Sequence, residues 1–138
     1  MRVLILTILL TGLQFICCAQ QDEDVKTFIA RVGWQQGDTN FWDKITINQI
    51  LALPSEYKVV ACELVYANKG EIYRIPYSDK LNSGKDSNLE KYRMYSLPWI
   101  LNRITSGNAK GQGFIVDNIQ VRKGDKTLKL KSKAIIVK

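Results

Sequence analysis

The stretch that decides the fold covers residues 113–138 and reads GFIVDNIQVRKGDKTLKLKSKAIIVK. Two apolar, β-branched runs flank the short connection KGDK at residues 123–126, an arrangement typical of a β-hairpin. The second run alternates, as expected for a half-buried antiparallel strand with a solvated lysine face. Its predicted faces are Leu128, Leu130, Ser132 and Ala134 toward a core and Lys129, Lys131 and Lys133 toward solvent.

Residues 1–19 have the layout of a secretory signal peptide. Met1 and Arg2 give a positive start, residues 3–16 are almost continuously apolar, and small residues precede a predicted cleavage point after Ala19. A membrane anchor is an alternative, but the apolar run is shorter than the ~20 residues that a spanning helix needs. Lipid attachment at Cys17 or Cys18 is a third alternative, although bulky residues ahead of both cysteines fit it poorly. We therefore predict a periplasmic or secreted protein with no membrane span in the mature chain.

The composition of the mature chain limits its chemistry. Without Arg2 it has 19 Lys and Arg residues against 13 Asp and Glu residues, a net charge of +6. Cys62 would be its one remaining cysteine, so no intramolecular disulfide can form. The sequence has no histidine, which removes the commonest general base and the commonest metal ligand.

Short strand patterns follow one another along the rest of the chain. Residues 20–24 are polar and acidic and predict a disordered lead. Strands are predicted at residues 25–32, 57–67, 71–77 and 92–97, with the second of them central in a sheet because both of its faces are apolar. A tight turn at residues 68–70 joins two of these strands, and Pro76 indicates a strand end or an edge position.

Three further segments complete the predicted domain. Residues 45–53 fit a strand or a helix, and we prefer a strand or irregular segment. Residues 78–91 have the composition of a long surface loop. Ser96 precedes a predicted helix at residues 97–105, with Pro98 in its first turn and Gly107 past its end. Runs of strands without a βαβ rhythm predict that residues 25–138 form one all-β domain, an antiparallel immunoglobulin-like β-sandwich with one short helix.

The sequence contains no recognisable catalytic constellation, and we expect neither an enzyme nor a bound cofactor or metal. Asp38 and Asp43 flank an aromatic loop, but loop acids of this kind are usually solvated. Cys62 lies in the predicted central strand, where a small core residue is the simpler interpretation. The glycine-rich residues 107–113 lack the Lys-Ser/Thr and the strand–loop–helix order of a phosphate-binding loop.

An aromatic loop offers a second functional hypothesis. Trp34, Phe41 and Trp42 lie among Gly, Gln, Asn and Asp residues, as in a platform that stacks against sugars. The same aromatic residues could instead fill the end of a β-sandwich core, where they would supply much apolar area. The sugar platform therefore depends on whether these rings are exposed.

The terminal hairpin carries the main basic feature, formed by Arg122, Lys123, Lys129, Lys131 and Lys133. Nucleic-acid binding is not expected, because base-stacking aromatics do not alternate with these charges and the chain is predicted to be exported. Lysines on an edge strand also prevent edge-to-edge pairing. A contact with an acidic partner is the functional interpretation of this face.

The last third of the chain resembles a known domain. The pattern is Ser106-Gly107, the apolar–Asp strand at residues 115–121, the Gly124-Asp125 turn and the terminal strand at residues 128–137. Together with the earlier strand at residues 58–65, this resembles the C-terminal domain of the gliding-motility stalk protein GldM and its relative PorM, of the type IX secretion machinery of Bacteroidetes. The resemblance covers residues 45–138. It implies an immunoglobulin-like β-sandwich without catalytic residues that packs against neighbouring copies or binds partner proteins.

The sequence thus predicts an exported, non-catalytic protein–protein interaction module of the bacterial envelope. Its expected contact surfaces are the terminal lysine face and the loop at residues 78–91, and a homodimer through an exposed strand edge is a further expectation. The alternative is a secreted carbohydrate-binding module that uses Trp34, Phe41 and Trp42.

Overall fold

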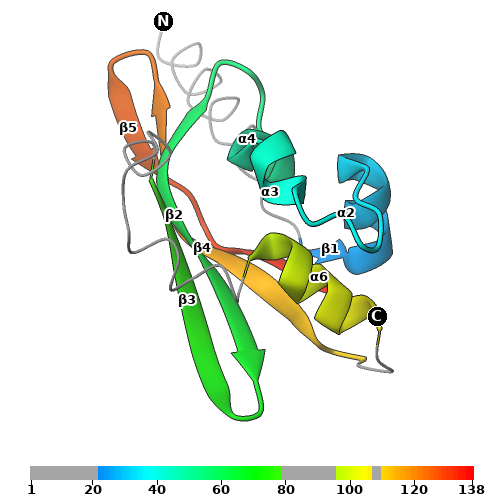
Figure 1. Ribbon diagram of the computed structural model, residues 1–138. Coiled ribbons are helices and arrows are strands. Elements are labelled where there is room, and N and C mark those ends of the chain that lie inside the picture. Colours follow the sequence, from blue (N-terminus) through cyan, green and yellow to red (C-terminus); the bar gives the residue numbers. More distant parts are fainter. Residues whose placement is uncertain (1–21, 79–95, 107–109) are drawn as a thin grey trace, which may run out of the picture.

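The computed structural model describes residues 22–78, 96–106 and 110–138 (Figure 1). The predicted signal peptide, most of the predicted loop at residues 78–91 and most of the predicted strand at residues 92–97 lie outside these ranges. In chain order the elements are β1 (Glu23–Asp24), α2 (Val25–Val32), α3 (Phe41–Lys44), α4 (Ile47–Leu51), β2 (Lys58–Asn68), β3 (Glu71–Ser78), α6 (Leu97–Thr105), β4 (Gly113–Lys123), β5 (Lys126–Lys129) and β6 (Lys133–Ile136).

The strands form one 6-stranded sheet in the order β1-β6-β4-β2-β3, with β5 paired to the other end of β4. Strands β2, β3, β4, β5 and β6 pair antiparallel, whereas β1 runs parallel to β6. Both predicted hairpins are confirmed: β2 turns into β3 through Lys69 and Gly70, which have positive φ, and β4 turns into β5 through Gly124. Strand β2 is central, as predicted, and Pro76 lies in β3, which is an edge strand of the described sheet.

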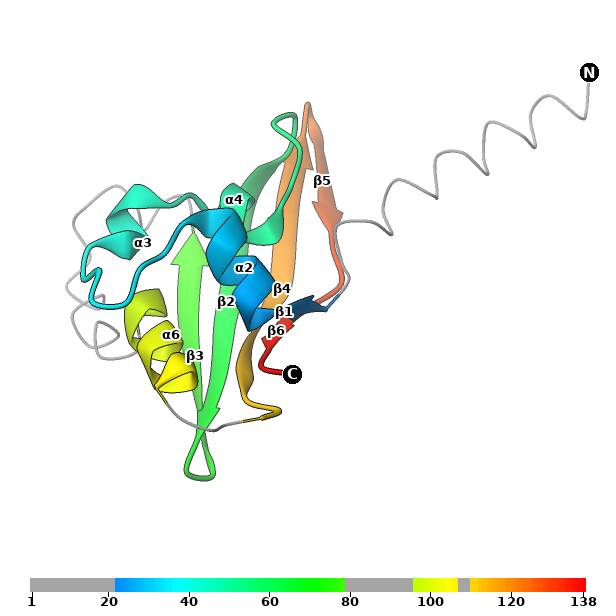
Figure 2. The same cartoon turned by 90° about the vertical axis from the view of Figure 1, so that its right-hand side faces the viewer.

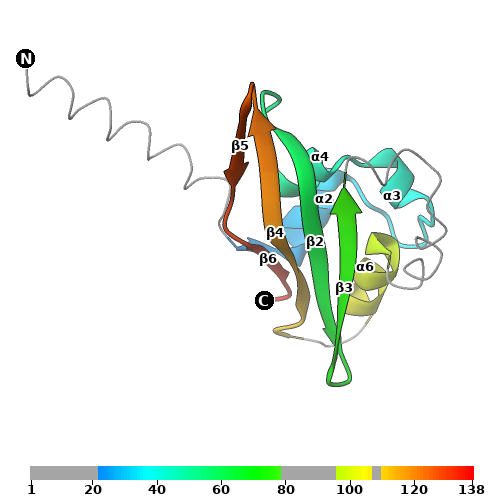
Figure 3. The same cartoon turned by 90° about the vertical axis from the view of Figure 1, so that its left-hand side faces the viewer.

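The helices α2, α3, α4 and α6 cover one side of the sheet, as Figure 2 shows. Figure 3 views the sheet from its other side, which we call the open face because no described element covers it. The core lies between the sheet and the helices. Phe28 of α2 meets Phe114 of β4 edge to face, with ring centroids 5.5 Å apart, and Tyr66 of β2 meets Trp99 of α6 in the same way at 5.6 Å.

Two bulges keep apolar side chains on the core side of the central strands. Pairing between β2 and β4 shifts register on each side of Ala61, which leaves Val60 of β2 and Asn118 of β4 as extra residues. Asn118 takes the left-handed conformation with φ 49°, which asparagine tolerates better than most residues. The buried set in β4 therefore changes parity across the bulge: Phe114 and Val116 before it, Ile119 and Val121 after it.

The faces predicted for the terminal strand are only partly right. The predicted strand is divided into β5 and β6, and the break between them lies beside the Asn118 bulge. After the interruption Lys133 and Ile135 are buried, whereas Ala134 is only half-buried. Lys129 and Lys131 are exposed as predicted, but the prediction for Lys133 was wrong because a single change of parity exchanges the two faces of a strand.

Three predictions near the N-terminus were also wrong. Residues 25–32 form helix α2 rather than a strand: Val25, Phe28, Ile29 and Val32 recur at helical spacing and line the side that packs on the core. Asp24 caps this helix through the backbone N–H of Lys26, at 2.8 Å. The predicted disordered lead contains β1. Residues 45–53, for which a strand or irregular segment was preferred to a helix, contain helix α4, which opens with a capping box of Thr46 and Gln49.

The predicted helix at residues 97–105 is confirmed as α6. The broader prediction of a mostly β, largely antiparallel fold also holds, and the observed sheet is open and accompanied by short helices. The described residues contain four helices, where one was predicted, and a single sheet, where a sandwich has two. The helices occupy the side of the sheet on which the second sheet of a sandwich would pack.

Candidate functional site

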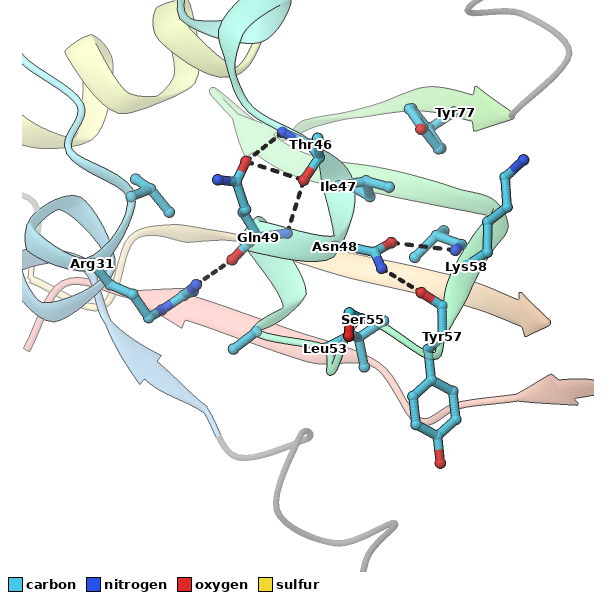
Figure 4. Close-up of a pocket in the computed structure, with 13 residues that line it drawn as sticks. Arg31, Thr46, Ile47, Asn48, Gln49, Leu53, Ser55, Tyr57, Lys58 and Tyr77 are labelled. Carbon is cyan, nitrogen blue, oxygen red and sulfur yellow. Dashed lines mark hydrogen bonds between the residues drawn. The ribbon is translucent and has the colours of Figure 1, made fainter. Parts of the chain in front are cut away.

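A groove of about 880 Å³ lies on the helical side, between α2, α4 and the start of β2 (Figure 4). Its polar groups stabilise the fold. Asn48 of α4 donates from Nδ2 to the Tyr57 carbonyl and accepts from the Val59 N–H at 3.3 Å, which joins α4 to β2. Thr46 and Gln49 bond to each other in the capping box. These groups are therefore engaged in holding α4 and β2 in place.

A partly buried ion-pair cluster borders this groove. Lys133 of β6, whose side chain is 6% exposed, places Nζ 3.0 Å from Oε2 of Glu23 in β1. Arg31 of α2 donates to both oxygens of the same carboxylate, at 2.9 and 2.8 Å, and to the carbonyls of Gln49 and Ile50 at the end of α4. Burial alone would raise the pKa of Glu23, but the hydrogen bonds and charges of Arg31 and Lys133 outweigh it and lower that pKa. The cluster ties β1, β6, α2 and α4 together.

The open face carries a second polar cluster, which we call the ion-pair network. Arg74 of β3 lies 2.9 Å from Oε2 of Glu63 in β2 and 3.7 Å from Oδ2 of Asp117 in β4. Asn118 donates from Nδ2 to Glu63 at 2.9 Å, and Ser132 donates from Oγ to Asp117 at 2.6 Å. The pKa of Asp117 is lowered, first by the Ser132 hydrogen bond, then by the Asn118 backbone N–H and by Arg74, against a small opposing effect of burial. Side chains of three strands and of the β5–β6 connection therefore meet here.

An apolar row crosses the open face beside this network. Ile72 is 67% exposed and Ile115 is 42% exposed, and they are the exposed large hydrophobic residues of the described chain. The strand registers place their neighbours on two adjacent cross-strand rungs, because residues opposite each other point to the same side. Ala134, Ile115 and Val65 lie on one rung, which ends at Arg74, and Ile136, Ala67 and Ile72 lie on the other, which crosses Gly113. We call the apolar members of both rungs the apolar row. Its members are Val65, Ala67, Ile72, Ile115, Ala134 and Ile136, each half-buried or exposed.

The β4–β5 hairpin extends past the network as a third part of this surface, which we call the basic hairpin. Its exposed cations are Arg122, Lys123, Lys126, Lys129 and Lys131. Arg122 and Lys129 point to the open face, whereas Lys123 and its partner Lys126 share the side of buried Val121 and point to the helical side. Lys123 lies 3.7 Å from Glu56 and 4.8 Å from the centroid of the Tyr57 ring. Within the described ranges, Arg122, Lys129 and Lys131 form no ion pair. Four of the five predicted partner-binding residues are thus exposed on this hairpin, and Lys133 is not.

The aromatic loop does not present the predicted platform. Trp34 is 4% exposed and Phe41 is 3% exposed, and both belong to the hydrophobic core. A buried ring cannot stack against a sugar, so these two residues fit the alternative role in the core. The side chain of Trp42 lies outside the described part of the structure.

The other residues considered for chemistry have structural surroundings. Cys62 is a buried free thiol, and burial, with a smaller effect of Glu63, raises its pKa to about 12. A thiol of that pKa does not form the thiolate that a nucleophile needs. Asp38 accepts from the Asn40 N–H at 3.2 Å and lies 3.4 Å from Lys44. In the described segments no three Asp, Glu or Cys side chains are placed to hold a metal ion.

The apolar row and the ion-pair network were not foreseen. The signal for the row was available, since Ile72 and Ile115 stand beside polar or small residues in strands with one covered face. The network depends on a register that joins residues far apart in sequence, such as Glu63 and Asn118, which are 55 residues apart. No family model, curated protein or solved structure matches this chain. Among the described helices, none is long and apolar enough to cross a bilayer.

Proposed function

We propose that this chain is a non-catalytic protein–protein interaction module of the bacterial envelope, exported by its signal peptide and similar to the C-terminal domain of GldM. The proposal is carried by one observation: the open face holds apolar residues on two adjacent cross-strand rungs, with Ile72 and Ile115 in solvent. Exposed apolar surface bordered by charged residues is typical of sites that contact other proteins. The open face is therefore the proposed docking surface.

The surroundings of the row favour a protein over a small ligand. The open face lies on the uncovered side of a sheet (Figure 3), whereas the groove described above lies on the opposite, helical side. Its ion-pair network and basic hairpin supply the polar rim that protein interfaces usually have. This arrangement supports a binding role rather than catalysis.

Two finer parts of the proposal rest on the sequence, through its predicted signal peptide and its resemblance to the GldM domain. The first is a periplasmic or secreted location in an organism that uses type IX secretion. The second is the immunoglobulin-like form of the sheet, which would need a second sheet although helices cover the core side of the described one. An experimental structure of residues 20–138 with a single sheet would reject the immunoglobulin-like form and leave the binding role intact.

The function is tested by photo-crosslinking in the native host. The full chain is expressed with a photo-reactive amino acid at position 115 on the open face or, as a matched control, at position 26 on the exposed side of α2. We expect a covalent adduct with one protein from position 115 and none from position 26, and recovery of the same protein with the tagged chain at moderate salt. Equal labelling from both positions, or none from position 115 or 72, would reject the open face as a docking surface.

A further inference from the structure

The three parts of the open face follow one another along the strands and so define the shape of the partner. Along β4, the outward-facing residues are Ile115 in the apolar row, Asp117 in the network, then Gln120, and Arg122 in the basic hairpin. Gln120 and Arg122 pair with Lys129 and Thr127 of β5, which brings Lys129 to the same side. The apolar and basic parts therefore lie at opposite ends of one continuous surface.

We propose that this surface binds a partner protein through a two-part segment. Apolar side chains of the segment cover Ile72 and Ile115, and Asp or Glu side chains further along it pair with Arg122, Lys129 and Lys131. This inference rests on the proposed function and adds the chemistry of the partner.

The spacing of the two parts sets the length of the segment. Ile115 and Arg122 are seven positions apart on β4, or six regular steps once the extra bulge residue Asn118 is left out. Six steps correspond to about 20 Å at roughly 3.3 Å per residue. An extended segment would cover that distance with about six residues, and a helical segment with about fourteen, at 1.5 Å per residue. The apolar and acidic residues of the partner should therefore be separated by one of these two intervals.

Charge distinguishes this partner from two others. An anionic membrane would meet the carboxylates of Glu63 and Asp117, which lie between the apolar row and the basic hairpin. A protein segment can place neutral residues there. A second copy of this chain would add a net charge of +6 after loss of the leader, and two basic hairpins would repel each other. An acidic protein segment has neither disadvantage.

The test uses purified residues 20–138, which contain every described element, and a displayed library of random 20-residue peptides. Selected peptides are synthesised, and their affinities are measured by fluorescence anisotropy at 50 and 300 mM salt. The variants are Ile115→Asp, the double variant Lys129→Glu/Lys131→Glu, and a control, Lys26→Glu, on the helical side. All four positions are exposed, and circular dichroism checks that each variant is folded.

We expect the selected peptides to combine apolar residues with Asp or Glu at one of the two intervals. Ile115→Asp and the double lysine variant should each weaken binding by about tenfold or more, which is ~1.4 kcal/mol, whereas Lys26→Glu should change it less than twofold. Binding should also weaken at the higher salt concentration, because the lysine contacts are exposed.

Four results would overturn the proposal. Peptides that need Ile115 but lack acidic residues, and ignore the lysine changes, would remove the two-part segment while the proposed function stands. Binding to phosphatidylglycerol vesicles but not to peptides, or a dimer in sedimentation that Ile115→Asp dissociates, would replace the partner by a membrane or by a second copy. Peptides unaffected by every variant, together with no crosslink from position 115, would reject the proposed function as well.

Discussion

Lys133 and Glu23 form an ion pair across the only parallel strand pair in the described sheet, with Nζ of the lysine 3.0 Å from Oε2 of the carboxylate. Both side chains are nearly buried, at 6% and 12% exposure. Because a buried ammonium group is costly without a partner, this contact fixes the short strand β1 against β6. It also fixes α2, since β1 continues directly into that helix and Arg31 binds the same carboxylate.

The first prediction concerns this pair. Glu23→Gln should lower the free energy of unfolding by about 3 kcal/mol, because it leaves the Lys133 ammonium buried without its counter-charge. Urea unfolding followed by circular dichroism measures the change. Glu56→Gln is the control, since Glu56 pairs with Lys123 on the surface at 52% and 50% exposure, and surface pairs contribute about 1 kcal/mol or less. A loss below ~1 kcal/mol for Glu23→Gln would show that the cluster does not hold β1 in place.

The second prediction is a pH dependence with a definite sign. The pKa of Glu23 is lower in the folded chain than its usual value of 4.5. The folded state therefore binds fewer protons than the unfolded state near that pH, so the stabilisation is complete above pH 4.5 and is lost as the pH falls through the folded pKa. Unfolding free energies measured from pH 7 to pH 3 should decline in the acid range, and Glu23→Gln should reduce that decline. An unchanged decline in Glu23→Gln, compared with the charge-matched Glu56→Gln, would assign the acid sensitivity to other carboxylates.

The third prediction concerns Gly113 at the start of β4. A Cβ atom at this position would lie 1.9 Å from the carbonyl oxygen of Ile135 in β6, so an alanine cannot fit without moving one of the two strands. Gly113→Ala should cost more than about 3 kcal/mol, at or beyond the upper range for overpacking. Gly124→Ala is the matched control: its φ is 56° but a Cβ there meets open space, and the expected cost is about 1 kcal/mol. Equal losses in urea unfolding would mean that β6 can move away from Gly113.

The strands of the two hairpins could be predicted because their signals are local. A turn of Lys69 and Gly70 and a turn at Gly124 each separate two apolar runs, and both hairpins follow from those patterns. Helix α2 was missed although Asp24 and Gly33 provide an N-cap and a left-handed C-cap. Its β-branched residues favoured the prediction of a strand. In the structure its apolar residues recur at helical spacing, so that a helix places all of them against the core.

The surfaces could not be predicted because they depend on long-range register. The Asn118 bulge and the interruption before β6 reverse the side to which later residues point, so that Lys133 turns inward to Glu23. Those two residues are 110 positions apart in the sequence. The exposure of Ile115 likewise depends on which side of the sheet the helices cover. No pattern within one segment contains that information.

The fourth prediction tests the interpretation of Cys62 as a core residue. Its thiol is buried and its pKa is raised to about 12, so at pH 8 the folded chain should contain very little thiolate. Residues 20–138 should react with a disulfide reagent only as fast as the chain opens, and addition of denaturant should make the reaction immediate and stoichiometric. Rapid labelling of the native chain would contradict the burial of Cys62. Cys62→Ala should leave partner binding unchanged.

The fifth prediction decides the carbohydrate alternative. Trp34 is buried and its Nε1 atom has no hydrogen-bond partner among the described residues, so its indole is a core group and cannot meet a sugar. In the double variant Trp42→Phe/Trp99→Phe, fluorescence comes from Trp34 alone, and acrylamide should quench it at least about fivefold less than free tryptophan, as expected for an indole out of contact with water. The complementary variant Trp34→Phe/Trp99→Phe reports on Trp42 by itself. Strong quenching of Trp34, together with a shift of its emission when oligosaccharide is added, would restore the aromatic platform. Weak quenching of Trp34 would confirm that its ring is buried. Because Phe41 is buried too, Trp42 would then be the one ring left for a sugar platform, and the carbohydrate hypothesis would fail.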